Sequence, residues 1–94
     1  MTAALDWTPE YRVGTLRTKP PMRLAEDCAR WIVQCDGPMA VCADPKGVVT
    51  VERPEDAFDG DLLGVYAPEL GRFELYRLIR DELREARKAL GVRP

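Results

Sequence analysis

The chain has 94 residues, of which 46% are hydrophobic and 32% are charged, and its formal net charge is −2. A chain of this length can bury about 60 to 70% of its unfolded surface, enough for one small domain without a metal or a disulfide. It contains no histidine, serine or asparagine, which excludes a Ser/His or Cys/His catalytic pair and a histidine-containing zinc site. We expect a single domain over residues 1–94, with no catalytic residue, no metal and no cofactor.

No apolar run approaches the ~20 residues that would cross a bilayer, and residues 1–9 lack the basic start and apolar middle of a signal peptide. Cys28, Cys35 and Cys42 are an odd number of cysteines. The first two would lie about 10 Å apart on one helix, which is too far for a disulfide. We therefore expect reduced, mostly buried thiols in a cytoplasmic protein that has no membrane partner.

The first half of the chain predicts a strand followed by a helix. Residues 1–9 show no periodic pattern, so a flexible arm is expected there. Apolar and polar residues alternate from Tyr11 to Thr18, which is typical of a strand, and Pro20-Pro21 can open a helix. From Met22 to Cys35 the apolar residues gather on one side of a helical wheel. Asp36-Gly37-Pro38 then ends the helix.

The middle of the chain predicts three more strands. Asp44-Pro45-Lys46-Gly47 has the residues that a type I turn favours at its first, second and fourth positions. This turn separates two β-rich runs, Met39 to Ala43 and Val48 to Arg53, so a β-hairpin is predicted. An acidic loop from Pro54 to Asp61 follows, and Leu62 to Ala67 reads as a further strand.

The last third of the chain, Arg72 to Leu90, carries the clearest pattern. Apolar residues recur at steps of three and four and fall within an arc of about 100°, which predicts an amphipathic helix that packs on the sheet. Whether this helix begins at Pro68 or after Gly71 is open, because Gly71 to Leu75 also reads as a short strand; we favour helix. The residues of the apolar arc are Leu75, Tyr76, Ile79, Leu83, Ala86 and Leu90.

These elements give the order β-α-β-β-β-α and predict the α+β class. We expect an antiparallel sheet of three to four strands with two amphipathic helices on one face. From Met22 onward the order is α-β-β-β-α, which is also that of the double-stranded RNA-binding domain. Pro68 to Gly71 lacks the clustered lysines that this family has where its last helix starts, so we assign the chain to no family.

Charge is divided between two stretches of the chain. The stretch from Glu52 to Asp61 contains five acids and one arginine, a net charge of −4. The stretch from Arg72 to Arg93 contains seven bases and four acids, a net charge of +3. Four arginines recur beside the apolar arc of the last helix, and four acids lie in the loop before Leu62. These eight are the predicted partner-binding residues: Arg77, Arg80, Arg84, Arg87, Glu55, Asp56, Asp59 and Asp61.

The acidic loop has two other interpretations. Asp56, Asp59 and Asp61 could ligate calcium, but their spacing does not fit the calcium-binding loop pattern. Carboxylates such as Asp56, Asp59 or the preceding Glu52 could do acid/base work, but a charged loop gives no reason for one of them to be desolvated. We also expect Phe58, within this loop, to turn inward.

Arginine suits bidentate contact with carboxylates and phosphates, so the stripe is interpreted as functional rather than as a solvated helix face. We expect a small non-enzymatic protein-protein interaction module. It would be an inhibitor or accessory subunit of a larger complex, or a homodimer. The alternative is a weak nucleic-acid binder that uses the same arginines on phosphates without reading bases. A net charge of −2 weighs against that alternative.

Overall fold

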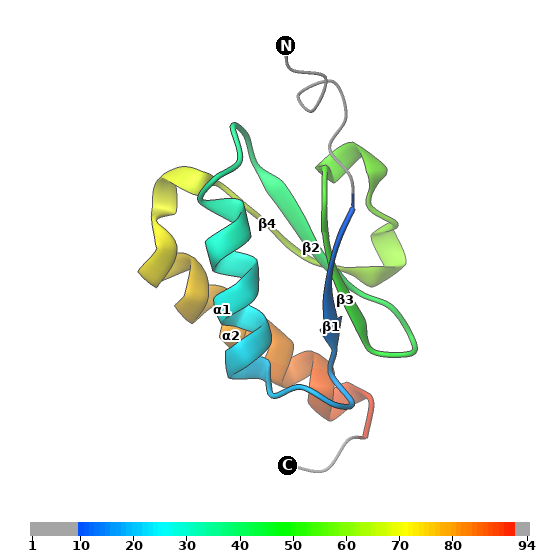
Figure 1. The fold of residues 1–94 in the computed structure, drawn as a ribbon. Helices are drawn as coiled ribbons and strands as arrows, with labels where there is room; N and C mark the ends of the chain where they lie inside the picture. Colours follow the sequence, from blue (N-terminus) through cyan, green and yellow to red (C-terminus); the bar gives the residue numbers. More distant parts are fainter. Residues whose placement is uncertain (1–9, 92–94) are drawn as a thin grey trace.

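A computed structural model describes residues 10–91, so the arm predicted over residues 1–9 lies outside the described residues. The element order is the predicted β-α-β-β-β-α, and the α+β class is confirmed (Figure 1). Neither of its two helices is long and apolar enough to cross a membrane. The elements are β1 Tyr11–Thr15, α1 Pro21–Ile32, β2 Met39–Ala43, β3 Val48–Glu52, β4 Leu62–Tyr66 and α2 Arg72–Ala89, with short 3-10 turns at η2 Pro54–Asp56, η3 Asp59–Asp61 and η4 Pro68–Leu70.

The four strands form one antiparallel sheet in the order β1-β3-β2-β4. The predicted hairpin of β2 and β3 is its centre. Both helices cover one face of the sheet, with α1 over β1 and β3 and α2 beside β4 (Figure 1). The open question about residues 68–75 is answered by a 3-10 turn followed by Gly71, whose φ of 85° lies in the left-handed region, and by a helix from Arg72.

The hairpin turn forms as its residues predict. The backbone amides of Lys46 and Val48 each donate to Asp44 Oδ1 at 2.9 Å. The Gly47 amide donates to the Asp44 carbonyl at 2.8 Å, and Gly47 has a φ of 92° that favours glycine. The aspartate therefore holds both ends of the turn and fixes the register of the two central strands.

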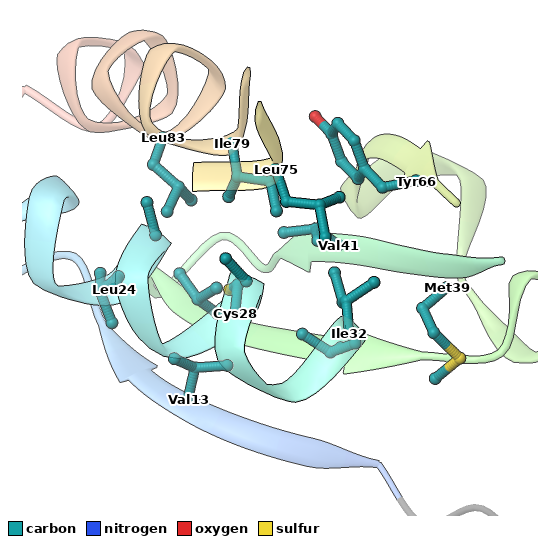
Figure 2. Packing of buried hydrophobic residues seen from close by; sticks show 14 of the residues in the cluster. Val13, Leu24, Cys28, Ile32, Met39, Val41, Tyr66, Leu75, Ile79 and Leu83 are labelled. Atoms are coloured by element: carbon teal, nitrogen blue, oxygen red, sulfur yellow. The ribbon is translucent and has the colours of Figure 1, made fainter. Parts of the chain in front are cut away.

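The core lies between the helices and the sheet. Leu75, Ile79 and Leu83 of α2, three residues of the predicted apolar arc, are fully buried. Leu24 and Ile32 of α1 point to the same space. Figure 2 shows these side chains with Val13 and Val41 of the sheet. The buried strand residues of this core are Val13, Met39, Val41, Val49, Val51 and Tyr66.

The connection between β3 and β4 has to cross the sheet. Both strands are antiparallel to β2, which lies between them, and the turns of residues 53–61 lie on the side away from the helices (Figure 1). Met39 and Val41 point into the core, so the alternating Ala40 and Cys42 point to this outer face. Both are nevertheless buried. Burial, followed by the carboxylates of Glu52 and Asp61, raises the pKa of the Cys42 thiol, so the connection, which ends at Asp61, passes close to β2 at this residue.

The edge strand β1 is attached to α1. Lys19 Nζ donates to the Val13 carbonyl at 3.3 Å and lies 3.4 Å from the Asp27 carboxylate. The Tyr11 ring stacks on Trp31 with the ring centroids 4.5 Å apart. Val13 sits where the β1–β3 register shifts, so an irregular strand segment is held by an ammonium group and an aromatic pair.

Replacing Ile79 with Ala should destabilise the fold strongly, because the side chain is fully buried between α1, α2 and the sheet. The expected loss in the free energy of unfolding is about 2 to 5 kcal/mol. The matched control is Arg77→Ala on the exposed side of the same helix, which should change it by less than about 1 kcal/mol. Urea denaturation of both variants measures the difference, and similar values would contradict the assigned helix orientation.

Candidate functional site

Two of the predicted arginines are engaged by residues of their own helix. Arg77 is exposed and forms a bidentate pair with Glu74, with its Nε 3.3 Å from Oε1. The Arg80 guanidinium lies 5.4 Å from the centre of the Tyr76 ring and 3.2 Å from the Asp81 carboxylate. Hydrogen bonds to Tyr76 and then to Asp81 raise the pKa of Arg80 above its ordinary value. Both charges are therefore partly neutralised before any partner arrives.

The other two arginines lie beside the start of α1. Arg84 is exposed and makes no ion pair with any residue from 10 to 91, whereas Arg87 is half-buried. Three acids, Asp81, Glu82 and Glu85, lie beside them, so this end of the helix carries both signs of charge. The two arginines line a hollow of about 720 Å³ with Pro20, Pro21, Met22, Asp81, Glu82, Glu85 and Lys88.

Phe73 is the most exposed large apolar residue among those described, at 80%. It precedes Ile79 by six residues, which places it about 120° around the helix from the core and level with the arginine stripe. The phenyl ring lines a second hollow, of about 370 Å³, with Glu26 and Tyr76 among its neighbours. Sequence reasoning missed this residue, although its position off the apolar arc was a usable signal.

Met22, at the start of α1, is 53% exposed and faces α2. It lines a third hollow of about 350 Å³ together with Glu26 and Tyr76. Met22 also lines the 720 Å³ hollow, and Glu26 and Tyr76 also line the 370 Å³ hollow beside Phe73. The three hollows therefore form one continuous furrow between the helices. We call it the helix furrow and define it by Met22, Glu26, Phe73, Tyr76 and Arg84.

The acidic loop lies outside the helix furrow, and its end at Gly60 and Asp61 lines another hollow with Ala86 and Ala89 of α2. Glu55, Asp56 and Asp59 are exposed and Asp61 is half-buried. None of the four forms an ion pair with residues 10–91. The expectation that Phe58 turns inward was wrong, since it is 69% exposed. The sheet separates this connection from the core, so the ring cannot reach it.

Apolar side chains of β4 share this outer face. Val65 pairs with Ala40, and Leu62 with Cys42, so both point to the outer face as their partners do. Leu62 and Val65 are exposed and lie on an edge strand. We call this region the outer acidic surface and define it by Glu55, Asp56, Phe58, Asp59, Asp61, Leu62 and Val65.

The aspartates of the loop do not converge on a point. Within residues 10–91 no group of three or more Cys, Asp or Glu side chains could hold a metal ion. The three aspartates lie in and beside two separate 3-10 turns on an exposed connection. This geometry fits a charged surface better than a coordination site.

The cysteines are free and largely enclosed. Burial, and then the charge of Asp27, raises the pKa of Cys28 to about 12. Burial, followed by the nearby carboxylates of Glu52 and Asp61, raises the pKa of Cys42 to about 11. Cys35 is half-buried just beyond α1, which ends at Ile32 rather than at Cys35 as predicted. Protonated thiols are poor nucleophiles, so these residues pack rather than react.

Comparison with protein families, curated proteins and solved structures found no match for this chain. A function therefore has to be argued from the two surfaces themselves.

Alkaline pH should destabilise the fold through Cys28 and Cys42. Their thiols ionise near pH 8.5 in an unfolded chain but only near 12 and 11 in the folded one. Between the unfolded and the folded pKa values, the folded state holds more protons than the unfolded state. The free energy of unfolding therefore falls as the pH rises, by at most ~1.4 kcal/mol per pH unit for each thiol. Urea unfolding of Cys42→Ala and wild type at about pH 8 and about pH 10 tests this. An equal decline in both proteins would contradict the assignment for Cys42.

Proposed function

We propose that this protein is a small non-enzymatic interaction module that binds another protein through the helix furrow. The observation that carries the proposal is Phe73, 80% exposed among arginines, with the exposed Met22 across the furrow. Single exposed apolar residues are common on protein surfaces. An aromatic residue and a methionine that line one furrow beside arginines have instead the composition of a protein interface.

Arg84 is the favoured ionic contact of this furrow. Because it has no ion pair within residues 10–91, a partner carboxylate can bind it without breaking an existing interaction. Arg77 and Arg80 already contact Glu74 and Asp81, so a partner gains less from them. The proposed partner surface combines an apolar side chain that packs on Phe73 with a carboxylate for Arg84.

We place this module in the cytoplasm as an accessory subunit or inhibitor of a larger complex. Three free cysteines fit a reducing compartment. The high pKa values of the Cys28 and Cys42 thiols keep both of them protonated and unreactive. This supports a binding role over thiol catalysis.

Replacing Phe73 with Ala should weaken partner binding at least ~10-fold, because it removes the central apolar contact of the furrow. The fold should lose less than about 1 kcal/mol, since the ring is exposed. The full chain would serve as bait in a lysate of the source cells, and calorimetry with the purified captured protein would give the affinity. Leu70→Ala is the matched control, because Leu70 is exposed but lies outside the furrow. Equal binding by both variants would contradict the proposal.

Reversing the charge at Arg84 should also weaken binding while leaving the fold intact. Arg84→Glu turns an attractive contact with a partner carboxylate into a repulsive one. Its stability should stay within about 1 kcal/mol of wild type, as for other exposed substitutions. Arg77→Glu is the comparison, and its effect on affinity should be smaller because Arg77 is already paired. A larger effect at Arg77 would place the contact about two turns nearer the start of α2.

Salt titration with a generic duplex separates this function from phosphate binding. Measurable duplex binding that falls steeply with salt would identify a nucleic-acid binder and contradict the proposed protein partner.

A further inference from the structure

Strand β4 forms one edge of the sheet and leaves part of its backbone open. It pairs with β2 alone among the described strands. Within residues 10–91, no backbone hydrogen bond outside this ladder involves Leu62–Tyr66. An edge strand offers its remaining N–H and C=O groups to another chain. The register shifts between Leu62 and Gly64, so the regular part of this edge is residues 64–67, with Ala67 still extended.

The opposite edge of the sheet, β1, is closed to a further strand. The Nζ atom of Lys19 already donates to the Val13 carbonyl, Arg12 places a charge on the strand, and the register with β3 shifts beside it. Charged side chains and bulges are the means by which proteins protect sheet edges. In contrast, β4 contains no charged residue and no proline, and its Val65 is 49% exposed. The edge that remains open is therefore β4.

The half of the sheet beside this open edge carries only negative charge. Residues 34–45, which include β2, contain two acids, and residues 54–71, which include β4, contain five; neither stretch contains a lysine or an arginine. A hollow of about 240 Å³ at the start of β4 is lined by two acids and by no base. Burial, and then the carboxylate of Glu82, raises the pKa of Tyr66 to about 12, so an acid of α2 also acts on this strand.

We propose that the open edge of β4 binds an extended basic segment of a partner protein, which joins the sheet as an added strand. This docking surface is separate from the helix furrow and does not depend on the function proposed above. The backbone of the segment pairs with residues 64–67, and its outward side chains pack beside Val65. Lysines or arginines at its ends lie beside Asp61 and Glu69, which flank the strand.

A second copy of this chain fits the edge less well. Antiparallel pairing of β4 with itself brings the residues before the strand in one copy beside the residues after it in the other. Asp61 and Asp59 of one copy would then approach Glu69 of the other. Like charges that meet across paired strands are destabilising. A basic segment meets no such repulsion, so charge favours it over a second copy.

The probe is a synthetic peptide of about eight residues in which valine and lysine alternate, a length that spans the edge. Titration calorimetry with the full chain should show saturable binding that weakens as salt is added. The same peptide with glutamate in place of lysine should bind at least ~10-fold more weakly. A version methylated on its backbone nitrogens keeps its charges but cannot donate to β4, and its binding should fall by at least ~10-fold as well.

Two variants of the full chain locate the site. Val65→Lys should weaken peptide binding at least ~10-fold, because it closes the edge with a charge that repels the peptide. Thr18→Lys is the matched control, since it adds the same charge at an exposed position just after β1, on the other edge of the sheet, and should bind as wild type does. Hydrogen exchange should show that the peptide protects amides of β4 and not those of β1. Circular dichroism checks the fold, and Leu62→Lys replaces Val65→Lys if that variant unfolds.

Three results would overturn the inference: no binding of the valine-lysine peptide, equal binding of the methylated peptide, or an equal effect of the two lysine variants. Protection of β4 without peptide, with a mass of twice 10.6 kDa, would assign the edge to a second copy and overturn it too. If the peptide fails to bind but Phe73→Ala still weakens binding of the captured protein, the proposed function stands and only this inference fails. The reverse result leaves this inference standing without the furrow.

Discussion

The position of β2 between β3 and β4 is the constraint on which the surface of this protein depends. Because the two outer strands of this trio are parallel, the chain must return across β2 rather than through a tight hairpin. The helices occupy one face of the sheet, so residues 53–61 cross on the other. That crossing gives residues 53–61, with their four acids, an exposed course, and its end at Gly60 and Asp61 lies beside the last turns of α2.

The packing of α2 explains why its outer face is available. Leu75, Ile79 and Leu83 are fully buried and use up the inner side of the helix. Phe73 is about 120° away on the same helix, so it cannot join them without unwinding the first turn. The burial of Leu75, Ile79 and Leu83 fixes the rotation of the helix, and this rotation keeps the aromatic ring of Phe73 on the surface. This supports a role in binding without requiring any strain.

Local patterns in the sequence predicted the elements well, and non-local arrangements poorly. The helix α2 and the turn from Asp44 to Gly47 are specified by residues close together in the sequence, and both predictions were confirmed. The strand order depends on which strands pair across the sheet, which alternation cannot specify. Phe58 was expected to turn inward, but it is exposed, because the connection that carries it crosses the outer face of the sheet, away from the core. The partners of Arg77 and Arg80 likewise follow from side-chain positions and not from the wheel alone.

Ala40 and Cys42 connect the interior of this protein to its display of charge. They are small and buried, and the carboxylate of Asp61, at the end of the crossing chain, acts on the thiol of Cys42. A bulkier side chain at either position would lift the connection away from β2 and reorient the acidic residues, although none of them had changed. Natural variation at two enclosed positions would in this way shift the acidic side chains, while the charged residues themselves stay constant.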